Sequence, residues 1–231
     1  MAPRDAAAAS DSGAGPAGAG GERPARVGAL APFRHSFFRA IWTTNLVSNF
    51  GTWFQSVGAA WAMTLLAPSA DMIALVQAAS SLPILLFSIW AGAIADMWNR
   101  RFILIASLVV MFAAAVTVAT LSYMGAITPW VLLAVTFAIG TGNALYSPAW
   151  QASVGEMVPR EEVPAAVALN SVNFNMTRAV GPALGGMVVA SAGITVAFAI
   201  NAFTYLPVIA AYALWGYKPA RSRLPRERAG L

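Results

Sequence analysis

The chain contains six long apolar stretches, and outside them its arginines and lysines occur only in the two tails and in alternate connections. These stretches are residues 40–67, 72–95, 102–124, 129–152, 163–192 and 194–217. The first, third and fifth connections contain no arginine or lysine, whereas both tails and the other two connections do. A spanning helix needs about 20 apolar residues, and basic residues collect on the cytoplasmic side of a membrane. The pattern therefore predicts six crossings, with every basic segment on one face.

The composition excludes an ordinary soluble domain. The chain is 58% apolar and 10% charged, whereas soluble domains carry about 25% charged residues. We therefore expect an all-α, multi-pass membrane protein with both termini in the cytoplasm. The net charge of +5 then indicates topology and contact with the lipid bilayer rather than nucleic acid. Because the chain has no cysteine and a single histidine, His35, we expect neither a metal centre nor a cofactor.

The predicted topology divides the chain into three regions. Residues 1–36 are rich in Ala, Gly, Pro and Arg, which predicts a disordered cytoplasmic tail. Residues 37–217 are predicted to form a six-helix transmembrane bundle, because lipid offers no partners to unpaired backbone groups. Residues 218–231 are predicted to be a basic cytoplasmic tail.

Polar side chains recur at helical spacing in three of the predicted spans. They are Asn45, Ser48, Asn49, Thr52 and Ser56 in the first, Gln77, Ser80, Ser81 and Ser88 in the second, and Asn170, Asn173 and Thr177 in the fifth. Residues at this spacing share one helix face. We expect these three spans to wall a polar cavity and the third span to be peripheral. Alternatively, the polar side chains hydrogen-bond one helix to another.

A lone basic residue, Arg178, lies in the middle of the fifth predicted span. A centred arginine costs about 2.5–3.5 kcal/mol on insertion scales, so it should face the bundle or an aqueous cavity. Both a functional and a structural role remain open for it. The candidate cavity residues are Asn45, Asn49, Thr52, Gln77, Asn173 and Arg178.

The fifth span continues as Gly181-Pro182-Ala183-Leu184-Gly185-Gly186. Proline removes the hydrogen bond to the carbonyl four residues earlier, which here belongs to Arg178. Gly181 and Gly185 let a neighbouring helix approach closely. The segment is either a tightly packed helix or a hinge beside a binding group.

The second connection ends one span with Asp96 and opens the next with Arg100 and Arg101. Taken alone, these residues indicate an anchored cytoplasmic turn and a helix cap.

Together these motifs resemble the major facilitator superfamily. The second connection is similar to its loop 2–3 motif, and Gly-Pro-x-x-Gly-Gly to its antiporter motif. Other segments resemble the branch that includes enterobactin exporters and macrolide efflux pumps: Trp53-Phe54-Gln55, Val76-Gln77-Ala78, Pro148-Ala149-Trp150-Gln151-Ala152, Val158-Pro159-Arg160 and Ala168-Leu169-Asn170-Ser171. The resemblance covers nearly all of residues 33–231.

The resemblance implies proton-driven export of an amphipathic small molecule, such as a drug or siderophore, through alternating access. It assigns conformational gating to Asp96, Arg100 and Arg101, and the antiporter-like bend to Gly181, Pro182, Gly185 and Gly186. Family members have twelve spans, so these six predict the N-terminal half. The partner would be a missing C-terminal half or a second six-helix subunit.

Other interpretations remain open. The chain could be a truncated, inactive gene product, a half-size subunit that must dimerise, or a structural membrane protein. An intramembrane Ser/His protease is disfavoured, because the chain lacks Gly-x-Ser-Gly and a membrane histidine. The intramembrane acid that would carry protons is also absent from the predicted spans, since Asp71 and Asp96 lie at their edges.

Overall fold

The computed structural model describes residues 28–67, 69–97 and 99–214, without the side chains of residues 88–97. The described residues are helical, with no strand among them. In order the elements are η1 (Ala31–Arg34), α1 (Ser36–Leu66), α2 (Ala70–Met97), α3 (Arg100–Tyr123), α4 (Pro129–Met157), η2 (Arg160–Glu162), α5 (Val163–Ala192) and α6 (Ile194–Leu214). The predicted C-terminal tail, residues 218–231, lies outside the described residues, as do residues 1–27 of the predicted N-terminal tail 1–36.

The helix ends follow local chemistry. The side chain of Asn99 caps α3 by accepting from the Arg101 amide, and Thr128 caps α4 by accepting from the Val131 amide. Such caps satisfy amides that have no partner within the helix. Gly193 ends α5 with a φ of 86°, a conformation that favours glycine. α1 starts at Ser36, four residues before the apolar stretch 40–67 begins. Only His35 separates it from η1.

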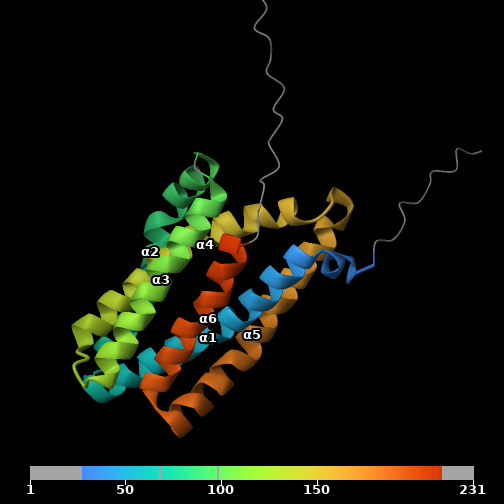
Figure 1. Ribbon diagram of the computed structural model, residues 1–231. Helices are drawn as coiled ribbons and strands as arrows, with labels where there is room; N and C mark the ends of the chain where they lie inside the picture. Colours follow the sequence, from blue (N-terminus) through green and yellow to red (C-terminus); the bar gives the residue numbers. More distant parts are fainter. Residues whose placement is uncertain (1–27, 68, 98, 215–231) are drawn as a thin grey trace, which may run out of the picture.

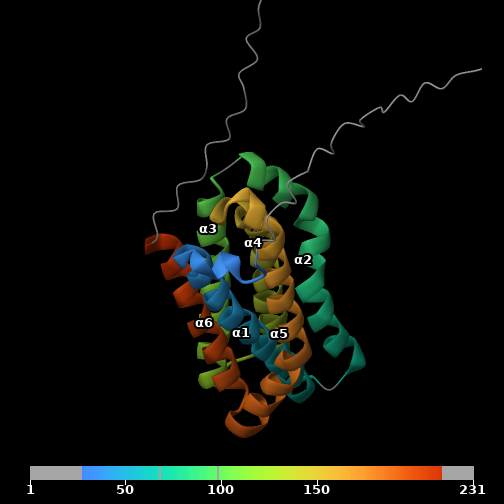
Figure 2. The same ribbon diagram turned by 90° about the vertical axis from the view of Figure 1, so that its right-hand side faces the viewer.

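Figures 1 and 2 show how the six α-helices of the described chain are arranged. In the view of Figure 2, α1 and α4 lie in the middle, with α3 and α6 on one side of them and α2 and α5 on the other. α1 packs mainly against α5 and α6, whereas α4 packs mainly against α2 and α3. If α1, α2 and α3 exchange places with α4, α5 and α6, respectively, each helix keeps equivalent neighbours. The bundle is thus built from two similar three-helix units, in which α1 and α4 are equivalent.

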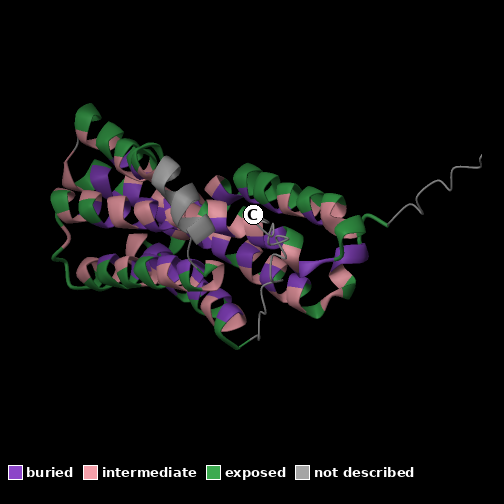
Figure 3. Ribbon diagram, turned by 90° about the horizontal axis from the view of Figure 1, so that it is seen from above, coloured by how far each residue is buried: buried purple, intermediate pink, exposed green. Residues whose placement is uncertain are grey.

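Apolar side chains cover much of the outer surface. Buried residues gather where helices face one another, and exposed residues lie outside (Figure 3). By length and hydropathy, four stretches of the described helices could cross a membrane: Ala70–Phe87, Arg100–Tyr123, Pro129–Met157 and Ile194–Leu214. α1 and α5 are long enough but fall outside this set, because they carry the polar stripes. The all-helical prediction is confirmed, and composition alone supports four of the six predicted spans.

Candidate functional site

The polar stripe of α1 faces into the bundle and lines two cavities. The first, which we call the Tyr146 cavity, measures about 180 Å³ and the second, the Gln77 cavity, about 120 Å³. The polar residues of the Tyr146 cavity are Asn45, Ser48, Asn49, Thr52, Asn143, Tyr146, Thr177 and Tyr205. Those of the Gln77 cavity are Thr52, Gln55, Ser56, Gln77, Ser80, Thr136 and Asn143. Thr52 and Asn143 belong to both sets, so the two cavities adjoin between α1 and α4.

Hydrogen bonds tie the α1 stripe to α4 and α5. The Tyr146 hydroxyl donates to Asn45 Oδ1 over 2.7 Å. Asn49 Nδ2 donates to Asn173 Oδ1 over 3.0 Å, and Asn173 Nδ2 donates to the Trp42 carbonyl over 3.1 Å. Both interpretations of the stripe therefore hold in part, since the same residues line cavities and bond neighbouring helices.

Several buried polar atoms around the cavities have no hydrogen-bond partner within the described part of the chain. They are Asn45 Nδ2 and the Tyr205 hydroxyl at the Tyr146 cavity, and Gln55 Nε2 and Thr136 Oγ1 at the Gln77 cavity. Buried polar groups nearly always find a hydrogen-bond partner, and leaving one unpaired costs about 1–3 kcal/mol. The cavities are thus suited to a guest that hydrogen-bonds, whether water or a neutral polar group of a ligand.

The sequence analysis did not predict that α4 lines the cavities. Thr136, Asn143 and Tyr146 line the cavities from α4, a helix that was not among the three expected walls. A signal was available, because Thr136, Gly140, Asn143 and Ser147 recur at i, i+4, i+7 and i+11. The α2 wall lies where the sequence placed it, with Gln77 and Ser80 at the Gln77 cavity.

α5 carries the remaining two candidate cavity residues, and they lie apart. Asn173 is 3% exposed and lies in the contact between α1 and α5. Arg178 is exposed, lines none of the cavities described here, and makes no hydrogen bond or ion pair within the described part of the chain. Its predicted role in the cavity remains a prediction.

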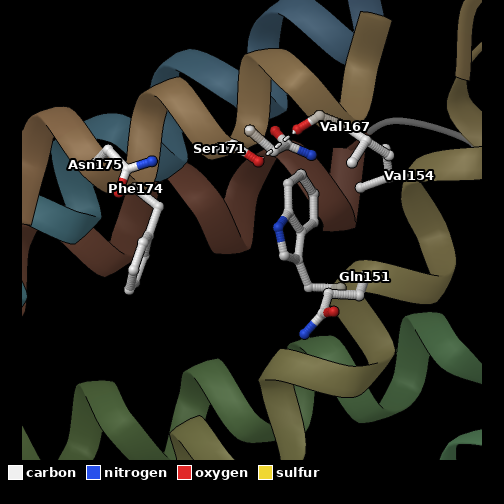
Figure 4. Close-up of a pocket in the computed structure, with 8 residues that line it drawn as sticks. Gln151, Val154, Val167, Ser171, Phe174 and Asn175 are labelled. Carbon is white, nitrogen blue, oxygen red and sulfur yellow. Dashed lines mark hydrogen bonds between the residues drawn. The ribbon is translucent and has the colours of Figure 1, made fainter. Parts of the chain in front are cut away.

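A groove between the ends of α4 and α5 joins this region, with a volume of about 380 Å³. The groove, here the α4–α5 groove, is lined by Trp150, Gln151, Val154, Val167, Asn170, Ser171, Phe174 and Asn175. Figure 4 shows the Phe174 ring pointing from α5 into the space beside α4. Because Phe174 also lines the Tyr146 cavity, the groove and the cavity are neighbours.

Glycines set the distance between α5 and α1. A Cβ on Gly181 would meet Trp53, and one on Gly185 would contact Phe54 and Val57, whereas one on Gly186 would meet nothing within 4 Å. The expected close approach of a neighbouring helix is confirmed, and the neighbour is α1. α5 is helical across Pro182; the antiporter-like bend stays a prediction.

The proposed gating residues lie at the basic end of the bundle. Arg100 forms an ion pair with Glu156 at the end of α4. Arg101 donates to the Ala213 carbonyl of α6 over 2.9 Å. The two arginines thus connect α3 to α4 and to α6, and Glu156 is a partner that the sequence reasoning missed. The side chain of Asp96 lies outside the described residues, so its gating role stays a prediction.

We expect Asn173→Ala to lower the free energy of unfolding by about 1–2 kcal/mol. The substitution removes the acceptor of Asn49 Nδ2 and the donor to the Trp42 carbonyl. Thermal unfolding in detergent measures the change. Asn175→Ala is the matched control, because Asn175 is exposed on the same helix. Equal loss in the two variants would show that the α1–α5 hydrogen bonds contribute nothing.

Residues 27–230 match the family described as transmembrane secretion effector, MFS_3. The chain is 26% identical over 156 residues to the staphyloferrin A transporter of Staphylococcus aureus, covering 67% of this chain and 39% of the relative. It is 28% identical over 158 residues to the MFS-type transporter YfiS of Bacillus subtilis, covering 68% of this chain and 36% of the relative. The chain thus matches well under half the length of each of these relatives.

Proposed function

The chain belongs to the transmembrane secretion effector family of major facilitator transporters, and we propose that it forms one six-helix half of an exporter. The family match confirms the superfamily resemblance, and it supports a role in transport rather than in catalysis. The branch of enterobactin exporters and macrolide efflux pumps stays a prediction. All six helices would span the bacterial inner membrane, with both termini in the cytoplasm.

The cargo we propose is an amphipathic small molecule, such as a drug or siderophore. One relative is named for transport of staphyloferrin A, which supports a siderophore-type cargo. A second six-helix unit, either a further segment or another copy, would complete the path, since the chain covers 39% and 36% of the two relatives. Protons would drive export, with the carrier residue in that second unit.

The observation that carries this proposal is the pair of adjoining polar cavities. They lie between α1 and α4, the two central helices, within a bundle whose outer surface is largely apolar. Secondary transporters place their substrate sites near the midplane of the membrane between repeated units. Thr52 lies about halfway along α1 and lines both cavities, so it marks the expected path.

Cysteine labelling tests the path, and the chain suits it because it has no cysteine. We expect Thr52→Cys, in membranes, to react with the charged reagent 2-aminoethyl methanethiosulfonate, because water reaches the cavities. The control is Val109→Cys, since Val109 is 46% exposed on the outer face of α3 and would face lipid. Mass spectrometry measures the rate of modification. Labelling of Thr52→Cys no faster than that of Val109→Cys would refute a water-accessible path.

A further inference from the structure

Arg178 carries a charge that the described protein leaves uncompensated. The described side chains include four carboxylates, and each lies in the first or last turn of an α-helix or in η2: Asp71, Glu156, Glu161 and Glu162. Glu156 already pairs with Arg100. Arginine keeps its charge in proteins, and charged groups within a membrane pair with one another or face a functional cavity. The exposed guanidinium of Arg178 is therefore suited to an anion from outside the described chain.

The depth of Arg178 limits where that anion comes from. Arg178 lies about halfway along the 30 residues of α5. A rise of 1.5 Å per residue places it about 20 Å from either end of the helix. A lipid phosphate at the membrane surface lies beyond the reach of its side chain. The anion must therefore reach the middle of α5, as a transported molecule would.

Arg178 also continues a row of side chains that line the α4–α5 groove. Ser171, Phe174 and Asn175 precede it by seven, four and three residues, so all four share one face of α5. The first three line the groove, and Phe174 also reaches the Tyr146 cavity. Figure 4 shows Ser171, Phe174 and Asn175 along α5. Arg178 lies one turn beyond Phe174, so it adds a positive charge to the end of a row of neutral side chains.

We propose that Arg178 binds a carboxylate of the exported molecule, whose neutral or aromatic part lies in the α4–α5 groove. The inference rests on the proposed export function and specifies its substrate class as an amphipathic carboxylate. The guanidinium presents parallel N–H donors that match a carboxylate in a bidentate contact. The groove supplies an aromatic surface at Trp150 and Phe174 and amide groups at Gln151 and Asn175.

Binding of two matched probes to the full chain in phosphatidylcholine nanodiscs tests this assignment. Dansylglycine has a carboxylate, whereas dansylglycinamide is neutral and nearly identical in shape. Energy transfer from the tryptophans, of which the chain has 8, reports their affinity. We expect the wild-type chain to bind dansylglycine about tenfold more tightly than the amide. Arg178→Gln should abolish this preference without weakening the amide, and Arg178→Lys should retain part of it.

The control variant is Arg39→Gln, which removes an exposed arginine near the start of α1 and should leave the preference unchanged. Equal affinities for the two probes in the wild-type chain, or a preference that survives Arg178→Gln, would overturn the assignment. An equal loss of both probes in Arg178→Gln would show a structural role and overturn it as well. Failure of both probes to bind the wild-type chain would also reject it, and labelling of Thr52→Cys then decides separately whether the proposed path survives.

Discussion

Gly140→Ala is expected to destabilise the bundle by about 1–3 kcal/mol, because α4 would have to move away from α2. A Cβ on Gly140 would lie 2.8 Å from the Ser80 carbonyl oxygen, 3.0 Å from Pro83 Cγ and 3.2 Å from the Ala79 carbonyl oxygen. Two of these atoms belong to the backbone of α2, which cannot turn aside as a flexible side chain can. Thermal unfolding in detergent measures the loss.

Pro83 explains why the α2 backbone faces a glycine at this point. Proline has no N–H, so the carbonyl of Ala79, four residues earlier, lacks its usual partner within the helix. Gly140 lets the α4 backbone approach that carbonyl. The double variant Gly140→Ala/Pro83→Ala should therefore lose less than the sum of the two single variants, since it removes the proline ring.

Gly155→Ala is the matched control for Gly140 on the same helix. A Cβ there would meet nothing within 4 Å, and alanine favours a helix over glycine by up to about 1 kcal/mol. We expect its melting temperature to equal or exceed that of the wild-type chain. If Gly140→Ala behaved in the same way, close contact between α2 and α4 would not be a feature of the folded protein.

Gly181→Ala should produce a loss of similar size, about 1–3 kcal/mol, in the contact between α1 and α5. The new Cβ would lie 2.5 Å from Cγ and Cδ1 of Trp53 and 2.9 Å from its Cβ. Rotation of the indole does not relieve the contact with Trp53 Cβ, which is fixed to the backbone. The helices must separate, and the Asn49–Asn173 hydrogen bond of the same contact should weaken.

Gly186→Ala provides the comparison for Gly181. It lies five residues further along α5, and a Cβ there would meet nothing within 4 Å. We expect Gly186→Ala to unfold at or slightly above the wild-type temperature, whereas Gly181→Ala unfolds several degrees below it. Hydrogen exchange of the α1 and α5 amides would locate the effect. Unchanged stability of Gly181→Ala would refute the packing described for these helices.

Helical periodicity anticipated part of the site and missed the rest. The α1 stripe was predictable, because five polar side chains at helical spacing must share a face whatever surrounds the helix. Asn143 and Tyr146 of α4 were missed, although Asn143 shares a helix face with Thr136 and Ser147. Their importance arises from α4 lying opposite α1, and periodicity within one helix contains no information on its neighbours.

The sequence by itself determined that the chain is helical, that its outer surface is apolar, and that its basic residues lie in alternate connections and in the tails. These properties depend on composition and local spacing. It also placed Arg178 in the middle of a helix and glycines on one face of α5. Only the tertiary structure decided that α1 and α4 enclose the polar cavities and that Asn173 bonds α1. It also decided that Arg178 is exposed and lines neither of those cavities. The physical reason is that a helix face acquires its role from the neighbour packed against it, and long-range packing makes that choice.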